Sequence, residues 1–252
     1  LEVALDAGDF ASMAMLTGTK VVHISERDTQ KIGRARRSGE FLNTWSPDGF
    51  YQESLAMAEI AWGTHERTLP EDSIQYNWGP GNQISISQRA LDVTARSWIP
   101  SGEIEGCVAP HGEAFTISQK LTLKKNGRVV YRPSVYFVYC PSEVAEQSLM
   151  EYADTGKDSP DFCNVMTSEI VSGADEVGVL LLGHDLGGWW TGSRLSIEET
   201  RKHVKDQNAT VLQVAASVLG AISYMVRNPR RGFRRVEDLP HREILATVSP
   251  YL

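Results

Sequence analysis

The feature that most constrains the fold is a run of short extended segments between residues 83 and 139. Segments rich in β-branched and aromatic residues follow one another there: QISIS, ARSWI, GCVA, KLTL, VVYR and SVYFVY. Asn126-Gly127 separates KLTLKK from RVVY, and this dipeptide is a strong signal for a two-residue hairpin turn. The pattern predicts a mixed or largely antiparallel sheet with flanking helices, so we expect an α+β fold.

The N-terminal part of the chain predicts a helix followed by a strand. Residues 1–18 read as a helix that Gly18 closes, and residues 20–27 (KVVHISER) read as a strand that ends in charged residues. Residues 43–68 mix turn signals with short helical runs and are dense in aromatic and carboxylate side chains. That density is unusual for a connecting segment and makes the region a candidate for function.

The C-terminal part predicts several helices and one more strand. Pro141-Ser142-Glu143 opens an amphipathic helix with Val144, Leu149 and Met150 inward, and residues 177–182 form a strand. Ser196 and Glu199 have capping-box spacing for a helix over residues 196–204. Asn208 caps a long apolar helix that Pro229 ends, and residues 237–248 form the last helix. The long helix carries small residues suited to close packing: Ala215, Ala216, Ser217, Gly220 and Ala221.

Composition limits the classes of function. With 252 residues, 41% hydrophobic and 23% charged, the chain fits one soluble domain over residues 1–252. The net charge of −7 disfavours nucleic acid and anionic membranes as partners and suits a cationic small substrate. The longest apolar stretch, taken as residues 177–182, is too short to span a bilayer. Two basic clusters, at residues 31–37 and 227–235, read first as solvated surface and second as a docking face.

Cysteine usage and the N-terminus indicate a reduced compartment. Cys107, Cys140 and Cys163 are widely spaced and form no CxxC pair, so we expect no metal site, buried or inert thiols, and a cytoplasmic protein. No secretory signal is present, because the first residues carry acidic side chains. The chain begins with Leu1, and we interpret it as a piece of a longer polypeptide.

Three carboxylates and a tryptophan are candidates for binding a cation. Glu26 stands at the end of a predicted strand, a frequent position for a ligand group, although a surface ion pair is the default interpretation. Trp45 is flanked by Asp48 and Glu53, and an indole face with nearby carboxylates can bind an ammonium group. On composition alone, the simpler interpretation that Trp45 and Phe50 cover a core under a loop is favoured.

Two histidines and the glycine clusters complete the candidates. His111, followed by Gly112 and Glu113, could shuttle a proton at a strand end, whereas His65 does not belong to an HExxH zinc motif. The clusters GPGN at residues 79–82 and GHDLGG at residues 183–188 lack the spacing of a phosphate cradle, and no GxGxxG or GxxxxGK[ST] occurs. The residues alone therefore name no reaction.

Longer blocks of sequence carry a resemblance. LNTWSPDGFYQES, AEIAWGTHERTLP, VYRPS, EIVSGADEVGVLL and LSIEETRKHVKDQNATVLQV are similar to homospermidine synthases, and matching blocks run from about Val21 to the final PYL. The resemblance implies the second, sheet-containing domain of a saccharopine dehydrogenase-like enzyme, which supplies substrate binding and dimer contacts. The helix over residues 1–18 would then continue from an NAD-binding domain that this chain lacks.

The resemblance also implies a reaction and roles for residues. NAD, recycled as a prosthetic group, would take a hydride from putrescine, and a second putrescine would then yield homospermidine and ammonia through imine intermediates. Glu26 and Glu53 would bind ammonium groups, Trp45 would hold the cation, and His111 would transfer or orient a proton. Weaker candidates for substrate binding are Asp48, Glu113 and Asp175. The resemblance implies a homodimer, and the isolated chain is expected to be inactive.

Two alternatives stay open. A carboxyspermidine- or saccharopine-type reductase on the same fold would need an arginine for a substrate carboxylate, and the candidates are Arg27, Arg89 and Arg96. A non-catalytic dimerisation module would use the long helix with its small residues as the interface.

Overall fold

The computed structural model describes residues 8–252 except 78–79 and 158. The chain forms two compact units, each built from three segments. Unit 1 comprises residues 1–27, 52–140 and 177–192, and unit 2 comprises residues 28–51, 141–176 and 193–252. Of the predicted helix over residues 1–18, the first seven residues lie outside the described part. The remainder forms α2 (Phe10–Thr17), which Asp9 caps and which ends at Gly18 in the left-handed conformation (φ 80°), as predicted.

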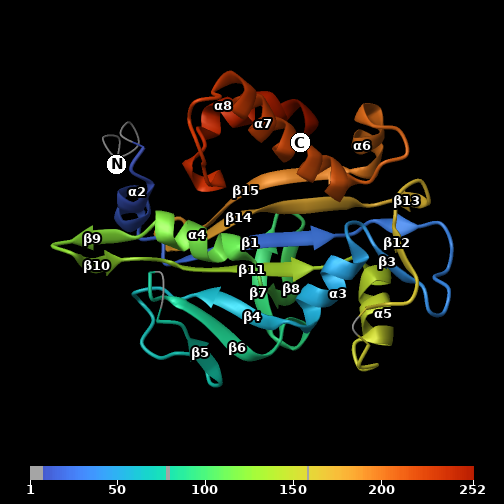
Figure 1. The fold of residues 1–252 in the computed structure, drawn as a ribbon, viewed down its shortest axis with the longest axis horizontal. Coiled ribbons are helices and arrows are strands. Elements are labelled where there is room, and N and C mark those ends of the chain that lie inside the picture. The colour runs from blue at the N-terminus through green and yellow to red at the C-terminus, as the bar shows by residue number, and fades with distance from the viewer. Residues whose placement is uncertain (1–7, 78–79, 158) are drawn as a thin grey trace. The chain divides into compact units, whose positions relative to one another are not determined.

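A mixed nine-stranded sheet belongs mainly to unit 1 (Figure 1). Its main path runs β15-β14-β1-β11-β4-β6-β5, and β8 joins β11 and carries β7. Strand β1 pairs with β11 in parallel, whereas β11 pairs with β4 and β8 in antiparallel fashion. The strand bounds are β1 (Val21–Asp28), β4 (Met57–Ala61), β5 (Ser73–Gln75), β6 (Gln83–Arg89), β7 (Thr94–Ile99), β8 (Gly102–Ala109), β11 (Ser134–Cys140), β14 (Ala174–His184) and β15 (Gly187–Ser196). The α+β expectation with a mixed sheet is confirmed.

Helix α4 (Gly112–Lys120) packs on one face of this sheet (Figure 1). Buried Ala114 from the helix meets Val22, Ala61 and Val135 from three central strands. The predicted hairpin is present as β9 (Leu123–Lys125) and β10 (Arg128–Tyr131), with Asn126 at φ 51° and Gly127 at φ 75° in the turn. Both positive φ values are those that a two-residue type I′ turn requires, which explains the Asn-Gly pair.

Unit 2 combines short strand pairs with helices. Its strands are β2 (Lys31–Ile32), β3 (Phe41–Asn43), β12 (Cys163–Val165) and β13 (Ile170–Ser172), paired β12-β3 and β13-β2. Helix α5 (Glu143–Tyr152) buries Leu149, but Met150 is 57% exposed, so the prediction that Met150 points inward is wrong. The buried face of α5 is formed by Ala145, Ser148, Leu149 and Tyr152. At about 100° per residue, Met150 lies beyond the edge of that face. Helix α3 (Pro47–Leu55) crosses the boundary between the units.

The predicted caps define the C-terminal helices of unit 2. Ser196 and Glu199 form a complete capping box before α6 (Ile197–His203), and Asn208 caps α7 (Ala209–Arg227). Gly220 of α7 allows close packing, because an added Cβ would lie 2.7 Å from a methyl group of Val248 in α8 (His241–Val248). Helix α8, predicted over residues 237–248, starts later than predicted, because a short 3₁₀ turn precedes it. Three such turns occur in the described chain: η1 (Ala90–Asp92), η2 (Val236–Asp238) and η3 (Ser249–Tyr251).

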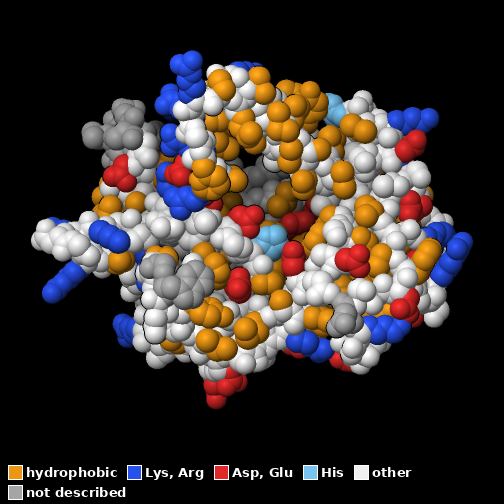
Figure 2. Space-filling model, in the orientation of Figure 1, with side chains coloured by type: hydrophobic (Ala, Val, Ile, Leu, Met, Phe, Trp, Pro, Cys, Tyr) orange, Lys and Arg blue, Asp and Glu red, His pale blue; other side chains and the backbone are white. Residues whose placement is uncertain are grey.

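Helix α7 is also the longest apolar element, which corrects the expectation that residues 177–182 hold that place. With 19 residues and a mean hydropathy of 1.7 it passes a length-and-composition test for a membrane span, with 33% of the apolar window buried. Core helices of soluble proteins pass the same test, so this is weak evidence. Figure 2 shows hydrophobic side chains gathered over α7 and α8.

Candidate functional site

The candidate site in unit 1 is organised around His111. Strand β8 ends at Ala109, and His111 occupies the N-cap position of α4 in an extended conformation. Its Nδ1 lies 3.2 Å from Oε2 of Glu113, and its Nε2 lies 3.3 Å from Oε2 of Glu53. The ring stacks on Phe137 of β11, with centroids 4.5 Å apart and planes at 21°. Both ring nitrogens and one ring face are therefore held in place.

The two carboxylates change the protonation of this histidine. Glu113 and then Glu53 raise the pKa of His111 to about 10, against burial, which acts in the opposite direction. His111 in turn lowers the pKa of Glu113. At neutral pH His111 is an imidazolium that donates from both nitrogens, so in this state it can give a proton or orient a group but cannot accept a proton.

Sheet register places Glu26 on the same face as this cluster. Glu26 of β1 is the partner of Tyr139 in β11, and Tyr139 is the partner of Cys107 in β8. Side chains alternate along a strand, so Tyr139 shares its face with Phe137, on which His111 stacks. Figure 2 shows acidic side chains beside a histidine where Figure 1 draws α4 and β1.

Cys107 lies near both residues that are predicted to bind ammonium groups, Glu26 and Glu53. Burial raises the pKa of the Cys107 thiol to about 12, and the charges of Cys140, Glu26 and Glu53 add to the effect. The structure thus brings Glu26 and Glu53 within electrostatic reach of one thiol. A thiol with this pKa is protonated at neutral pH and is therefore a poor nucleophile.

Glu59 of β4 was not singled out from the sequence. It is partly buried, burial raises the pKa of its carboxyl, and the charge of His111 acts in the opposite direction. The sequence contains one local signal for this residue: Glu59 is a single carboxylate among apolar residues in AEIAW. Residues 43–68 had been read as turns and short helices, so strand β4 and the face it presents were missed.

Trp45 and Asp48 belong to unit 2. Trp45 is partly buried and contacts Phe50 edge-on, with ring centroids 5.8 Å apart at 66°. Its ring also lies over Gly49, where an added Cβ would come within 3.2 Å of Cζ3. Asp48 is exposed at the start of α3 and accepts a hydrogen bond from Sγ of Cys163 at 3.6 Å. The glycine leaves room for the indole, and the aromatic contact fixes one edge of it.

Asp175 of β14 is fully buried in unit 2 and contacts the first turn of α7. Its Oδ2 accepts a 2.7 Å hydrogen bond from Thr210, whose hydroxyl also accepts from Nε2 of Gln30. Gln30 in turn donates to Asp28 and accepts from the backbone N–H of Ala209. These contacts favour a role for Asp175 in anchoring α7.

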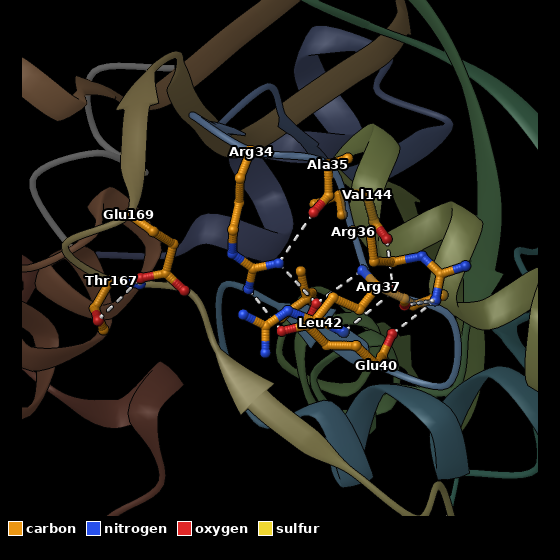
Figure 3. A network of polar contacts seen from close by, with 10 residues as sticks. Arg34, Ala35, Arg36, Arg37, Glu40, Leu42, Val144, Thr167 and Glu169 are labelled. Atoms are coloured by element: carbon orange, nitrogen blue, oxygen red, sulfur yellow. Dashed lines mark hydrogen bonds and ion pairs between the residues drawn. The ribbon is translucent and has the colours of Figure 1, made fainter.

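The basic cluster at residues 31–37 was interpreted first as solvated surface. Part of it forms a network of hydrogen bonds and ion pairs (Figure 3). Arg34 forms a bidentate pair with Glu40 at 2.6 and 2.8 Å, and Arg36 pairs with Glu151. Arg34 first of all lowers the pKa of the buried Glu40 carboxyl to about 2, against burial, and a backbone N–H of Arg37 adds to the lowering. In the second cluster, Arg227 pairs with Glu243 and Arg235 with Asp238. Both clusters thus include arginines that pair within unit 2.

No group of three or more His, Cys, Asp or Glu side chains with metal-binding geometry occurs among the described residues. GHDLGG forms the turn between β14 and β15, with Gly183 at φ 89° and Gly187 at φ 86°, and precedes a strand. A pyrophosphate cradle needs a glycine-rich loop before a helix N-terminus, so this turn does not fit NAD. GPGN lies partly outside the described residues.

Comparison with known proteins agrees with this architecture. The Saccharopine dehydrogenase C-terminal domain family model matches residues 6–251. The homospermidine synthase of Blastochloris viridis is 40% identical over 246 residues, which is 97% of this chain and 52% of that protein. The homospermidine synthase of Mesorhizobium japonicum is 38% identical over 250 residues, 98% of this chain and 52% of that protein.

A solved structure shows the same fold. The homospermidine synthase from Legionella pneumophila in complex with NAD superposes with a TM-score of 0.94 at 36% identity, covering 100% of this chain and 57% of that one. This chain thus spans about half the length of these relatives and resembles their C-terminal half. With a family model that covers nearly all its residues, the chain belongs to the Saccharopine dehydrogenase C-terminal domain family.

Proposed function

We propose that this chain is the amine-binding part of an NAD-dependent homospermidine synthase, which couples two putrescines to homospermidine with release of ammonia. The observation that carries the proposal is the His111 cluster, in which Glu53 and Glu113 hold an imidazolium and Glu26 shares the sheet face. A site that is rich in carboxylates and has no cysteine nucleophile suits a dication. The similarity to the two homospermidine synthases supports the choice of diamine.

In this proposal NAD is the hydride acceptor and donor, and it is bound mainly by an NAD-binding domain outside this chain. Glu26 and Glu53 bind terminal ammonium groups. Imidazolium His111 competes with the substrate for Glu53 and can donate a proton to a leaving amine. Trp45 of unit 2 is proposed to bind a cationic group of the substrate with its indole face, and Asp48 and Glu113 are weaker candidates for binding it. Asp175 was a weaker candidate as well, but its buried bond to Thr210 favours the anchoring role. The protein would work as a cytoplasmic enzyme, and the isolated chain would lack synthase activity.

The reductase alternative has less support. A substrate carboxylate needs an available arginine, but Arg89 pairs with Asp92 at 2.7 Å, and Arg96 lies 3.8 Å from both Glu103 and Glu105. Arg27 follows Glu26 on β1 and therefore points to the opposite face of the sheet. Each observation favours an amine over an amino acid as the ligand beside His111.

A homodimer remains part of the proposal. Helix α7 presents apolar side chains that are 43–74% exposed: Val214, Val218, Leu219, Ile222, Met225 and Val226. A contiguous apolar stripe of this kind is typical of a protein interface. Sedimentation should give a dimer for the wild type and a monomer for Val218→Glu. A monomeric wild type at tens of micromolar would remove the dimer from the proposal.

Calorimetric titration with putrescine tests the amine site directly. Glu53→Gln and Glu26→Gln should each weaken binding by about tenfold or more, since each removes one charge-assisted hydrogen bond. Glu71→Gln, at an exposed loop position of the same unit, is the charge-matched control and should bind as the wild type does. Binding of the dicarboxylate glutarate in preference to putrescine would instead support the reductase.

A further inference from the structure

Glu59 is the carboxylate that the proposed function leaves unassigned. It lies on β4, where Ala61 is the partner of Val135 in β11. Side chains alternate along both strands, so Glu59 faces the same side of the sheet as Ala61, Val135 and Phe137. Phe137 carries the stacked ring of His111. The register therefore directs Glu59 to the face on which the candidate site lies.

The protein itself gives Glu59 little compensation. Within the described residues it has no hydrogen bond or ion pair, and only the charge of His111 acts on it favourably. His111 cannot donate to it in this arrangement, because Glu113 and Glu53 occupy both ring nitrogens. A partly buried carboxylate without a partner is unfavourable, and a ligand cation would supply the missing charge.

The carboxylates around His111 outnumber the ammonium groups of a diamine. Four carboxylates and one imidazolium lie on this face or contact it: Glu26, Glu53, Glu59, Glu113 and His111. Among these five groups, with each carboxyl counted as a carboxylate, the negative charges exceed the positive charge by three. A protonated diamine supplies two positive charges and a protonated linear triamine supplies three.

We propose that Glu59 is a specificity-determining residue that binds an additional ammonium group, so that the site prefers a linear triamine to a diamine. The inference rests on the proposed function, because it adds a third anionic partner to the amine site of Glu26 and Glu53. In a coupling reaction of two diamines, the ligand with three nitrogens is the product. Glu59 would then hold the newly formed chain while its ends remain bound to the other carboxylates.

The test is a pair of calorimetric titrations, with putrescine and with homospermidine, at one pH and ionic strength. Wild type should bind homospermidine more tightly than putrescine. Glu59→Gln should weaken homospermidine binding by about tenfold and putrescine binding by about twofold or less, because only the triamine uses this carboxylate. Glu71→Gln should change neither affinity, and thermal unfolding of each variant verifies that the fold is retained.

Each outcome separates this inference from the proposed function. Equal losses for the two amines in Glu59→Gln would show a general electrostatic effect and overturn the specificity role, as would unchanged affinities for both. Absence of putrescine binding by the wild type would instead overturn the proposed function, and the role of Glu59 with it. Glu59→Asp, which keeps the charge on a shorter side chain, should retain part of the preference for the triamine.

Discussion

The two units use polar residues in opposite ways. In unit 2, buried Asp28 accepts hydrogen bonds from Thr44 and from two nitrogens of Gln30, and the network continues to Thr210. In unit 1, carboxylates outnumber the cationic group between them, and Glu53 and Glu113 are 37% and 56% exposed. A satisfied buried network fixes a structure, whereas incompletely balanced, accessible charges are available to a ligand.

The difference predicts where mutations act. Removing a partner from the buried network leaves desolvated groups unpaired and should reduce stability. Removing a carboxylate from the accessible cluster should change stability little, because solvent screens such pairs, but should change ligand binding. The experiments below test this division, from the largest expected effect to the smallest.

The largest effect is expected for Asn208→Ala in unit 2. Asn208 is fully buried, its Nδ2 donates to the carbonyl oxygens of Thr44 and Met166 at 2.7 Å, and its Oδ1 accepts from the N–H of Val211. The substitution removes the cap of α7 and leaves two buried carbonyls unpaired. Denaturant unfolding should show a loss of about 3 kcal/mol or more.

Ser196→Ala is the matched control, because it removes the cap of α6 at an exposed position. Its loss should be about 1 kcal/mol. Equal losses in the two variants would mean that the buried bonds of Asn208 add nothing to its capping role, and the contrast between buried and accessible polar groups would fail.

A smaller effect is expected for Trp45, which lies in unit 2 but has a proposed ligand role. A desolvated cation over an indole gains about 2 kcal/mol, so Trp45→Ala in the enzyme with its NAD-binding part should weaken amine affinity or turnover about 30-fold. Trp45→Phe should retain part of the activity. A pure packing role predicts that Trp45→Ala lowers stability by about 3–5 kcal/mol, in step with activity. Unchanged turnover in a well-folded Trp45→Ala protein would end the cation–π hypothesis.

The Arg34–Glu40 pair should give a pH-dependent effect on stability. Arg34 lowers the folded-state pKa of Glu40 to about 2, so the contribution is present above the ordinary glutamate pKa of about 4.5. It is lost as pH falls from there toward about 2. The free energy of unfolding measured between pH 6 and 3 should show this loss. In Glu40→Gln the decrease in that free energy between the two pH values should be smaller by about 1–2 kcal/mol. An identical pH dependence in the variant would exclude the pair as its source.

Local signals in the sequence predicted the elements that end in specific caps or turns. Gly18, Asn126-Gly127, Ser196 and Asn208 were each assigned correctly, because the backbone conformation or the capping bond involves residues close in sequence. Glu53 and His111 were also named as candidates from the sequence, and the family resemblance gave them their roles. Their contact joins residues 58 positions apart, which no local pattern encodes.

Elements that depend on tertiary pairing were missed. Helix α4 contains Thr116 and Ile117, which disfavour helix, and Ala114 is held by packing on the sheet. Strand β15 was not predicted, and its glycines are unfavourable in a strand on their own. Gly192 is required there by close backbone approach, since an added Cβ would lie 2.3 Å from the carbonyl oxygen of Val177. Strand β4 was hidden in a turn-rich segment, and with it the face that carries Glu59.

The smallest effect on stability, but the most specific signal, is expected from His111. Its pKa is raised to about 10, so its contribution is fully present below about 6.5 and is lost as pH rises toward 10. Because its partners are more than one-third exposed, we expect at most about 1 kcal/mol in unfolding experiments. An NMR titration of the ring should nevertheless show a midpoint far above that of an ordinary histidine.

Variants of Glu53 and Glu113 show how much each carboxylate raises the pKa of His111. Glu113→Gln should lower the midpoint of His111 more than Glu53→Gln does, since the bond to Glu113 is the larger cause, and Glu71→Gln should leave it unchanged. Saturating putrescine should also lower the midpoint, because an ammonium group that binds Glu53 removes part of what stabilises the imidazolium. A wild-type midpoint near 6.5 would show that the carboxylates do not hold the proton. The cluster in unit 1 would then contain no imidazolium for a ligand ammonium group to displace from Glu53.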